Sequence, residues 1–417
     1  MLSLRNQTIS VLGAGRSGRA AAALAERLGG EVTLYDSREV EGAVQVTLEE
    51  AAQVRSDLVV LSPGIPPESN FVQAFLKQGG VLWGEVELAS RVYQGTVLGI
   101  TGTNGKTTTT ELAVLLFRAA GKSCLPCGNY GVPFSEVVLM EEVPETVALE
   151  LSSFQLETAV QLKPDAVIWL NFSPDHMDRY RSLADYRAAK LRIFNQVGRG
   201  TPAVVRRGED LEGMKGDIIL FDAESGPLNS QILQDHPEVQ LRGRHNLENL
   251  AAAFATVSRL TGLSREQAVE ALSGYEPPEH RCQFVRHLDG VDYINDSKAT
   301  NLHALKSALQ AFDQRIILIA GGKEKGLEYQ ELIKYMKEKV TSAIFFGEIG
   351  ASLKVTFEGA TDCHLCEELT EAVLLARRLA KAGDLVLFSP GTSSFDQFTS
   401  YQQRGAAFQE AVAALPG

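Results

Sequence analysis

The sequence predicts an α/β protein built from three domains in series, and three observations lead to this fold class. Apolar strand-like segments alternate with helix-like segments along the chain, a pattern that favours parallel sheets covered by helices on both faces. Glycine-rich turns follow several of these strands. With 417 residues, the chain has the length for about three domains of roughly 150 residues, each with its own core.

The first domain is expected over residues 1–92 with a Rossmann-like fold. Thr8–Leu12 is apolar, Gly13–Gly18 has the spacing GxGxxG, and an alanine-rich helix leads to a strand that ends at Asp36. This order is typical of a nucleotide-binding βαβ unit. The turn by itself leaves three possibilities open: a dinucleotide site, a site for another nucleotide, or structural packing.

The central domain, expected over residues 93–277 with a P-loop ATPase-like fold, carries the strongest motif. The strand Thr96–Ile100 runs into Thr101–Thr108, whose sequence TGTNGKTT precedes an expected helix. Glycines let backbone NH groups surround phosphate oxygens, the helix N-terminus attracts anions, Lys106 adds a cation and Thr107 can bind Mg²⁺. The first glycine of the strict P-loop pattern is missing, so a purely structural turn is the alternative.

Two further segments of the central domain hold candidate metal ligands. Glu150 follows an apolar strand, at the sheet edge where α/β proteins place ligands, and could complete a magnesium site with Thr107. A solvated loop acid is the alternative for Glu150. Asp175, His176 and Asp178 follow another strand and are either metal ligands or a cluster that caps a turn.

The third domain is expected over residues 278–417, after a proline-rich linker at residues 275–281, and again shows a Rossmann-like α/β pattern. Lys298, Lys323 and Lys325 lie just beyond the ends of expected strands. Lysines in this position favour an anionic ligand, although exposed loop lysines are common without one.

Bulk composition excludes several classes of protein. A formal net charge of −12 argues against a nucleic-acid partner, and no segment approaches the ~20 apolar residues that span a bilayer, so a cytoplasmic protein is expected. An odd number of cysteines suits a reducing compartment. The pairs Cys124/Cys127 and Cys363/Cys366 could in principle serve a zinc or redox site, but ordinary packing is favoured.

A series of short motifs resembles those of one enzyme family. In chain order they read TGTNGKTT, ELSSFQLE, DHMDRY, AAKLRIF, RHNLENLAAA, HR, NDSKATN, GGKEKG and SPGTSSFDQF. Together they resemble the Mur ligases, which build the peptide stem of bacterial cell-wall precursors, and the match covers essentially the whole chain. Within that family, SPGIPP, GEVELA and QQRG are most similar to members that add D-glutamate.

The resemblance implies an ATP-dependent ligase that acts as a monomer on UDP-N-acetylmuramoyl-L-alanine and D-glutamate through an acyl phosphate. The first domain would hold the uridine diphosphate part of the substrate, the central domain ATP and two Mg²⁺ ions, and the third domain the amino acid. This assignment disfavours a nicotinamide cofactor at the GxGxxG turn.

The resemblance also implies a set of residues for ATP, metal and catalysis. The expected nucleotide contacts are Gly102, Thr103, Asn104, Gly105, Lys106, Thr107, Thr108, Asn246, Asn249, Arg281 and Asp296. Thr107 and Glu150 would hold one Mg²⁺, and Glu150, His176 and a carbamylated Lys190 the other. Without the resemblance, Lys190 would be read as a surface charge on a helix. The expected catalytic residues are Lys106, Glu150, His176, Lys190 and Arg281.

Substrate contacts are implied in all three domains. Those expected for the uridine nucleotide are Gly15, Ser17, Asp36, Ser37 and Ser62, and those near the reacting end of that substrate are Asn129 and Ser152. Those expected for the amino acid are Lys298, Thr300, Lys325, Ser394 and Tyr401. Lys323 is the alternative to Lys325, because the glycine-lysine loop aligns with the family in two ways.

Three rival functions remain open at this stage. A related ligase of the Mur or folylpolyglutamate type would use another amino acid. A scaffold or regulatory protein would bind the nucleotide sugar without turnover, although Lys106, Glu150, His176 and Lys190 are all present. A nicotinamide-dependent oxidoreductase rests on the GxGxxG turn alone.

Overall fold

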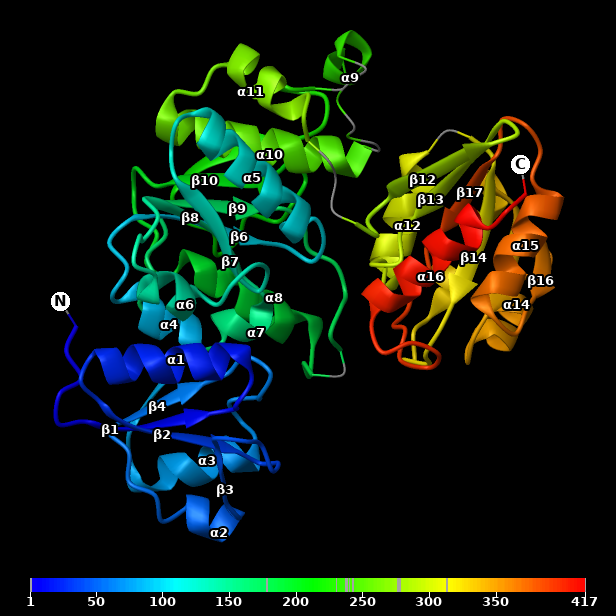
Figure 1. Ribbon diagram of the computed structural model, residues 1–417. Coiled ribbons are helices and arrows are strands. Elements are labelled where there is room, and N and C mark those ends of the chain that lie inside the picture. The colour runs from blue at the N-terminus through cyan, green and yellow to red at the C-terminus, as the bar shows by residue number, and fades with distance from the viewer. Residues whose placement is uncertain are drawn as a thin grey trace. The chain divides into compact units, whose positions relative to one another are not determined.

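A computed structural model describes residues 2–416 except 178, 230, 237, 238, 240, 242, 243, 276–278 and 313. The chain forms two compact units, Met1–Ile232 with Glu248–Leu272, and Leu233–Leu247 with Ser273–Gly417. Two sheets lie in the first unit and one in the second (Figure 1). The predicted α/β fold class is confirmed. The predicted boundary between residues 277 and 278 lies outside the described residues and stays a prediction.

The first sheet has parallel strands in the order β3-β2-β1-β4-β5. Its strands are β1 (Thr8–Leu12), β2 (Glu31–Asp36), β3 (Val44–Gln45), β4 (Leu58–Leu61) and β5 (Val81–Gly84). Side chains alternate between the two faces, so Leu58 and Val60 pack in one core and Val59 and Leu61 in the other. The helices of this part are α1 (Arg16–Arg27), α2 (Leu48–Ala51), α3 (Asn70–Phe75), the 3₁₀ helix η1 (Leu76–Gln78) and α4 (Glu85–Ser90).

The central sheet is also parallel, in the order β11-β10-β9-β6-β8-β7. Its strands are β6 (Thr96–Thr101), β7 (Cys124–Gly128), β8 (Thr146–Glu150), β9 (Ala166–Trp169), β10 (Pro202–Arg206) and β11 (Asp217–Phe221). The helices that follow along the chain are α5 (Lys106–Ala119), α6 (Phe134–Leu139), α7 (Ser153–Leu156), α8 (Leu183–Leu191), η2 (Arg192–Phe194), α9 (Gln231–Asp235), α10 (Arg244–Thr261) and α11 (Arg265–Leu272). Helices α5, α10 and α11 lie on one side of this sheet, and α6, α7 and α8 on the other (Figure 1).

One continuous apolar core joins the first and central sheets. Helices α1, α4 and α6 lie between the two sheets (Figure 1), and the same core contains Val11 of β1, Leu88 of α4, Phe134 of α6 and Leu149 of β8. An ion pair of 3.1 Å between Arg16 and Glu136 adds a polar contact at its edge. The two sheets therefore form a single unit rather than two separate bodies.

The third sheet has the order β12-β13-β17-β14-β15-β16 and contains one antiparallel pair, β12 with β13. Its strands are β12 (Gln283–Leu288), β13 (Val291–Asn295), β14 (Ile316–Gly321), β15 (Val340–Phe346), β16 (Asp362–Leu365) and β17 (Leu385–Phe388). This pair is antiparallel because the chain turns back at Asp289 and Gly290, which connect β12 to β13 with φ angles of 49° and 78°. An Asp-Gly pair with positive φ is typical of a two-residue β-hairpin turn.

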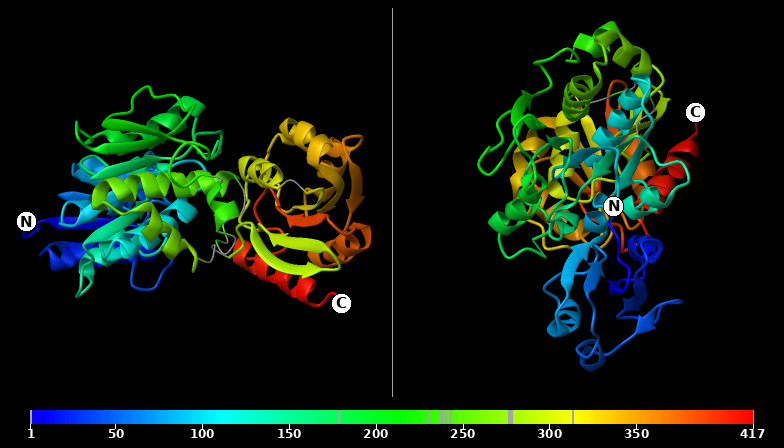
Figure 2. Two further views of the ribbon diagram at one scale, coloured as in Figure 1. Left: turned by 90° about the horizontal axis from the view of Figure 1, so that it is seen from above. Right: turned by 90° about the vertical axis from the view of Figure 1, so that its left-hand side faces the viewer.

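Helices cover both faces of the third sheet (Figures 1 and 2). They are α12 (Leu302–Ala311), the 3₁₀ helix η3 (Tyr329–Leu332), α13 (Ile333–Lys339), α14 (Gly350–Phe357), α15 (Leu369–Leu379) and α16 (Tyr401–Ala413). Leu318 faces the core built with α12, α13 and α14, whereas its neighbours Ile317 and Ile319 face the core built with α15 and α16. The alternation along β14 thus explains why the sheet is buried on both sides.

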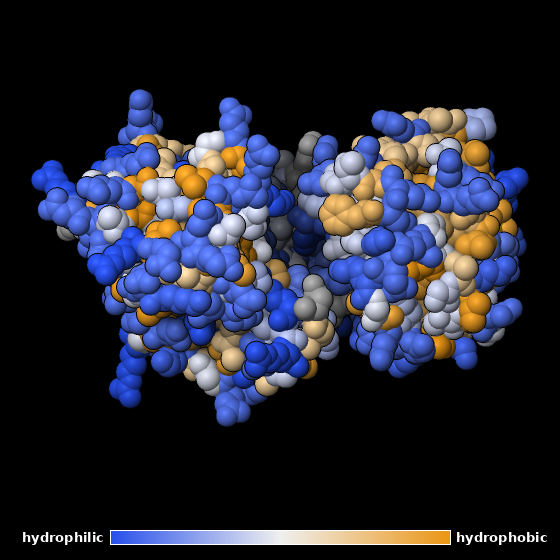
Figure 3. Space-filling model, turned by 90° about the horizontal axis from the view of Figure 1, so that it is seen from below, coloured by the Kyte–Doolittle hydropathy of each residue, from blue (hydrophilic) through white to orange (hydrophobic). Residues whose placement is uncertain are grey.

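One face of the molecule is mainly hydrophilic. On the face shown in Figure 3, apolar residues form only small areas among polar ones. Within the part of the chain that the structure describes, no helix combines the length and apolar character needed to cross a bilayer.

Two buried carboxylates on α4 differ in their partners. Glu87 forms an ion pair of 2.7 Å with Arg91 and accepts hydrogen bonds from the backbone NH groups of Val160 and Gln161. Glu85 accepts one hydrogen bond, from the NH of Ser135, and its other oxygen has no partner among the described residues. Burial raises the pKa of Glu85 to about 7.

We expect Glu85→Gln to stabilise the protein at pH 8 and to have little effect at pH 5. The folded-state pKa of Glu85 lies above its unfolded value, so the stability associated with this group falls as pH rises from about 4.5 to about 7. The neutral amide removes that loss, which corresponds to about 1–3 kcal/mol of unfolding free energy at pH 8. Denaturant unfolding at both pH values measures the effect.

Glu87→Gln is the matched control, because it should destabilise the protein by about 2 kcal/mol or more through loss of the buried ion pair with Arg91. Equal unfolding free energies for Glu85→Gln and wild type at pH 8 would contradict the expectation.

Candidate active site

The phosphate-binding loop lies between β6 and α5, as the sequence predicts. Gly105 precedes α5 with φ of +85°, and a Cβ atom there would lie 2.3 Å from Oδ1 of Asn249. A Cβ on Gly102, at φ of +156°, would lie 2.8 Å from Cβ of Leu170. Both positions therefore require glycine, for backbone conformation and for space. The contact also brings predicted Asn249 against the loop, although it comes from a helix far along the chain.

A second segment, after β9, supports this loop. The NH of Asn104 donates to the side-chain oxygen of Asn171 at 2.9 Å, and the side-chain amide of Asn171 donates back to the carbonyl of Asn104 at 3.1 Å. The Thr103 hydroxyl and the backbone of Ser173 are also hydrogen-bonded. Sequence reasoning missed Asn171 as a site residue; its position just beyond a buried strand was the available signal.

Two lysine side chains converge on the carbonyl oxygen of Gly102. Nζ of Lys106 donates to this oxygen and to the carbonyl of Thr103, each at 2.9 Å, and Nζ of Lys190 donates to the Gly102 oxygen at 2.9 Å. Lys190 is 1% exposed, so it is not the surface charge that its helix position would suggest. Burial and, next, the charge of Lys106 hold the pKa of Lys190 well below its usual value, and the acids Asp175 and Glu150 offset part of this shift.

Glu150 ends β8 beside the phosphate loop and is 1% exposed. Its Oε1 accepts a hydrogen bond of 2.7 Å from the side-chain amide of Asn129, and the NH of Asn129 donates to the Glu150 carbonyl. Its Oε2 is buried without a partner among the described residues, as is the hydroxyl of Thr108. Buried carboxylate oxygens are rarely left unpaired, so this oxygen suits a bound cation.

His176 lies on the loop after β9, with φ of +56°. Its ring is 4.8 Å from that of Phe154 and 3.8 Å from the Asp175 carboxylate. Arg179 and Tyr180 hold the loop through Glu157, at 2.5 Å each. The second acid of this segment, Asp178, lies outside the described residues.

Two of the predicted metal ligands, Thr107 and Glu150, offer the oxygen atoms that Mg²⁺ prefers, whereas His176 offers a ring nitrogen and Lys190 could offer oxygen only as a carbamate. Among the described residues, no three His, Cys, Asp or Glu side chains lie close enough to form a metal site by themselves. The predicted sets do not need such a group, because they combine Glu150 with Thr107, or with His176 and Lys190. The unpaired Oε2 of Glu150 is the observation that favours a cation here.

In the first sheet, the GxGxxG turn is shaped by Asp36. Its carboxylate accepts hydrogen bonds from the NH groups of Ala14 and Arg38 at 2.9 and 3.0 Å. Burial alone would raise the pKa of Asp36, but these amide groups outweigh it and lower the pKa. A Cβ on Gly18 would lie 1.8 Å from the carbonyl of Gly13, whereas one on Gly15 would meet nothing within 4 Å. Gly18 is thus needed for packing, and Gly15 leaves the turn open.

The other serines predicted to contact the first substrate lie near this turn or, for Ser152, at the N-terminus of α7. The hydroxyl of Ser62 donates to the Gly13 carbonyl at 3.2 Å, Ser17 lies in the first turn of α1, and Ser37 is exposed after β2. Ser152 caps α7 through reciprocal bonds with Gln155. All four serines could contact a ligand. Ser62 and Ser152 also have structural roles, because each forms hydrogen bonds within the protein.

In the second unit, the predicted amino-acid contacts lie on turns at the carboxyl ends of β13, β14 and β17. Lys298 and Thr300 follow β13, Lys325 follows β14, and Ser394, which is 2% exposed, follows β17. Nζ of Lys298 lies 5.6 Å from the ring centre of Tyr401 at the start of α16. One sheet edge therefore brings together all five residues.

Lys323 and Lys325 differ in their surroundings. Nζ of Lys323 pairs with Glu348 at 2.7 Å. No described carboxylate pairs with the ammonium of Lys325, although its backbone NH and that of Gly326 bond the Glu324 carboxylate.

Three predicted nucleotide contacts also fall in the second unit. Asn246 is 3% exposed. Asp296 is buried, accepts bonds from the Ser389 hydroxyl and the Cys282 NH, and burial raises its pKa to about 6. Nε of Arg281 is buried without a partner in the described part of the chain.

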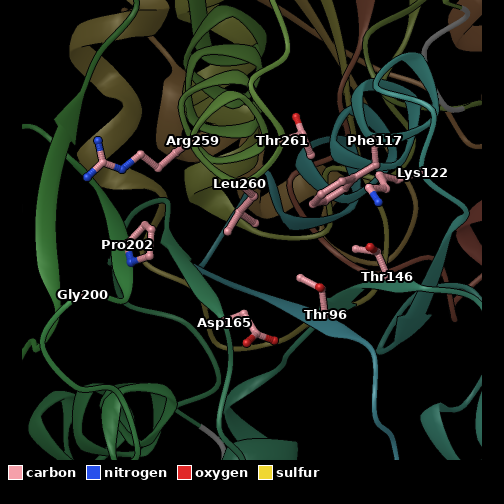
Figure 4. Close-up of a pocket in the computed structure, with 10 residues that line it drawn as sticks. All are labelled: Thr96, Phe117, Lys122, Thr146, Asp165, Gly200, Pro202, Arg259, Leu260 and Thr261. Carbon is pink, nitrogen blue, oxygen red and sulfur yellow. The ribbon is translucent and has the colours of Figure 1, made fainter.

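The pocket in Figure 4 is not this site. It has a volume of about 420 Å³ and is lined by Thr96, Phe117, Lys122, Thr146, Asp165, Gly200, Pro202, Arg259, Leu260 and Thr261 (Figure 4). Thr96, Thr146 and Pro202 begin their strands, so the pocket lies at the opposite edge of the central sheet from the phosphate loop. None of the predicted site residues lines it.

Comparison with known proteins shows which family this sequence matches. Residues 100–257 match the Mur ligase middle domain, and residues 280–391 match the Mur ligase, glutamate ligase domain. The chain is 38% identical to the UDP-N-acetylmuramoylalanine--D-glutamate ligase of Desulfitobacterium hafniense (strain DSM 10664 / DCB-2), over 99% of this chain and 98% of that protein. It is also 38% identical to the ligase of the same name from Myxococcus xanthus (strain DK1622), over 99% and 100% of the two chains.

Solved structures show the same fold at low sequence identity. The MurF ligase from Thermotoga maritima in complex with ADP has a TM-score of 0.62 at 15% identity, covering 99% of this chain and 96% of the other. The UDP-N-acetylmuramate-alanine ligase MurC from Thermotoga maritima has a TM-score of 0.57 at 18% identity, covering 98% and 100%.

We expect Gly105→Ala to weaken binding of Mg²⁺–ATP at least about tenfold, because the new Cβ meets Asn249 and the residue must keep a positive φ. Gly198→Ala is the control, since a Cβ there meets nothing within 4 Å. Calorimetric titration of both variants measures the difference. Wild-type affinity in Gly105→Ala would show that the loop does not hold the phosphates.

Proposed function

Because the chain belongs to the Mur ligase family, we propose that it joins D-glutamate to UDP-N-acetylmuramoyl-L-alanine while converting ATP to ADP and phosphate, in the synthesis of peptidoglycan precursors. The observation that carries this proposal is the phosphate loop, where Lys106 and Lys190 meet at one carbonyl beside the unpaired carboxylate oxygen of Glu150. Relatives named for this reaction align with essentially the whole chain, including all three sheets.

The physical difficulty of the reaction is the approach of a carboxylate to the γ-phosphate of ATP. Two like unit charges about 4 Å apart repel by roughly 4 kcal/mol at an effective dielectric constant of 20. Cations fixed in advance reduce this cost, and Lys106 supplies one from a buried helix start. Arg281, whose Nε is unpaired among the described residues, is proposed to supply another to the γ-phosphate.

Magnesium is proposed to be held by Thr107 and Glu150, with His176 and Lys190 joining Glu150 around a second ion. Bound Mg²⁺ neutralises phosphate charge and makes the γ-phosphorus more electrophilic. Asn129 supports this arrangement, because its hydrogen bond to Oε1 fixes the Glu150 carboxylate and leaves Oε2 for the metal.

Lys190 is proposed to carry a carbamate. Its depressed pKa favours the neutral amine, which can attack CO₂, form a nitrogen–carbon bond and release one proton. An ammonium group has only donors, whereas the carbamate has two oxygens that can bind a metal. The ammonium group of Lys106 also favours a negative group at this position, because it repels a second ammonium group and attracts a carbamate.

The reaction is proposed in two steps. An oxygen of the alanyl carboxylate attacks the γ-phosphorus, the bond to the β-phosphate oxygen breaks, and ADP leaves an acyl phosphate. The amine of D-glutamate then attacks the acyl carbon, loses a proton, and phosphate departs as the amide forms. Asn129 and Ser152, which flank Glu150 at the same sheet edge, are proposed to contact the substrate near its reacting end.

The remaining substrate groups are assigned to the first and third sheets. The open side of Gly15 supports a uridine diphosphate site at the first turn, with Ser17, Asp36, Ser37 and Ser62 around it. For D-glutamate, we favour Lys325 over Lys323 as the carboxylate contact, because Glu348 already pairs with Lys323. Free thiols at all five cysteines support a reducing, cytoplasmic setting.

Phosphate release from ATP tests the function. With Mg²⁺ and UDP-N-acetylmuramoyl-L-alanine, we expect release that depends on D-glutamate and is not supported by L-glutamate, L-alanine or a diamino acid. Release with one of the other amino acids would move the chain to another branch of the family. No release with any amino acid would reject catalysis in favour of simple binding.

For Lys190→Ala we expect loss of activity by about a hundredfold or more, because the metal ligand is removed. Short carboxylic acids such as acetate should restore part of the activity by placing a carboxylate in the vacated space. Lys163→Ala, at an exposed lysine of the same unit, is the control and should remain active. Full activity in Lys190→Ala without added acid would overturn the assignment.

A further inference from the structure

Arg404 is a fully buried cation in the second unit. It lies on α16 with 0% exposure, and no described carboxylate forms an ion pair with it. Burial lowers the pKa of Arg404 to about 10, so the guanidinium stays protonated at neutral pH, helped by the more distant charges of Asp396 and Asp296. Burying a charge without an ion-pair partner is costly, so its hydrogen bonds indicate what it stabilises.

Those hydrogen bonds join two of the turns at the sheet edge. Nε of Arg404 donates to the hydroxyl of Ser297 at 3.1 Å, and Nη2 donates to the Ser297 carbonyl at 2.8 Å. Nη2 also donates to the carbonyl of Thr392 at 3.1 Å. Ser297 lies on the turn after β13 and Thr392 on the turn after β17. The Ser297 hydroxyl in turn donates to the carbonyl of Tyr401 at 2.8 Å.

The third turn, after β14, passes close to the same guanidinium and is hydrogen-bonded to the turn after β17. A Cβ atom on Gly322 would lie 3.0 Å from Nη1 of Arg404, so the glycine allows the turn to pass over the group. The Thr392 hydroxyl donates to the Lys323 carbonyl, and the Lys323 NH donates to the Ser393 carbonyl at 2.9 Å. Nη1 itself has no hydrogen-bond partner among the described residues.

These contacts place the guanidinium beneath the predicted amino-acid contacts. Lys298, Thr300 and Ser394 lie within three residues of Ser297 or Thr392, to which Arg404 donates. Lys325 follows Gly322 by three residues, and Tyr401 precedes Arg404 by three. We propose that Arg404 is a positioning residue for the incoming amino acid. It joins the turns after β13 and β17, the second of which is hydrogen-bonded to the turn after β14, and it leaves Nη1 to stabilise that third turn when Lys325 engages a carboxylate. The inference rests on the proposed function, because it assigns the amino acid to this edge.

The geometry requires arginine rather than another cation. The planar guanidinium reaches three acceptors on two turns and still faces a third turn, whereas an ammonium group is a compact charge on a flexible stem. Arg404→Lys therefore keeps the charge and loses the fixed arrangement of the turns, and Arg404→Gln loses both.

Arg286 is a matched control in the same unit. It also donates to three backbone carbonyls, those of Val412, Ala413 and Leu415 at the end of α16. These bonds lie at the opposite end of the helix from Tyr401. Arg286→Lys should therefore cost stability without changing substrate binding.

The test is steady-state phosphate release by the full chain, with the KM of each substrate and the melting temperature measured for every variant. For Arg404→Lys we expect the KM of the amino acid to rise about tenfold or more while the KM of ATP changes less than about twofold. Arg286→Lys should leave both KM values unchanged at a similar loss of melting temperature. A KM of the amino acid equal to wild type, or KM values that rise together for all substrates, would overturn the proposal.

Ser297→Ala keeps the test decisive if the Arg404 variants do not fold. It removes one acceptor of Arg404 and the bond to Tyr401 while preserving side-chain volume, and should raise the KM of the amino acid about threefold or more. An unchanged KM would count against the proposal. Failure of the proposed function is visible separately, because the wild-type chain would then release no phosphate with D-glutamate. If it uses another amino acid, the KM of that amino acid decides the role of Arg404.

Discussion

The contact on which the central site depends is the convergence of two lysine amines on the carbonyl oxygen of Gly102. Lys106 is held there by the start of α5, and Lys190 arrives from a buried position on α8. Two positive groups at one carbonyl repel each other, and burial of Lys190 adds a desolvation cost, so the neutral amine is favoured at that position. An anion, whether a phosphate or a carbamate, relieves this repulsion. The lysine amines beside the phosphate loop therefore favour an anion at this position.

Three of the unpaired buried polar atoms lie at or beside the proposed sites of the two units. Most buried polar groups in proteins are hydrogen-bonded, and Glu87 follows that rule with an ion pair and two backbone NH partners. Glu150, Arg281 and Arg404 each keep one buried atom without a partner among the described residues, and all three lie near the carboxyl ends of parallel strands. Glu85 is also incompletely paired but lies in the interface between two sheets, where the consequence is a raised pKa rather than a binding site.

Packing determines which of the proposed substrate contacts belong to the same compact unit. The first and central sheets share one apolar core through α1, α4 and α6, so the open turn at Gly15 and the phosphate loop belong to a single unit. In the second unit, Arg404 donates hydrogen bonds to the turns after β13 and β17. Hydrophobic packing thus fixes the proposed nucleotide contacts within the first unit, and a buried guanidinium fixes two of the turns that carry proposed amino-acid contacts within the second.

The sequence by itself determined the α/β class, the strands on which the motifs lie and the phosphate loop, because these follow from local periodicity and from glycines at fixed spacing. The Asp289–Gly290 pair, which turns the chain between the antiparallel strands β12 and β13, is a local signal of the same kind. Only the tertiary structure decided that Lys190 is buried, that Asn171 and Asn249 lie against the phosphate loop, and that Arg404 links two turns of the second unit. These contacts join residues far apart in the chain, and their burial and pairing depend on how the sheets stack, which no local pattern encodes.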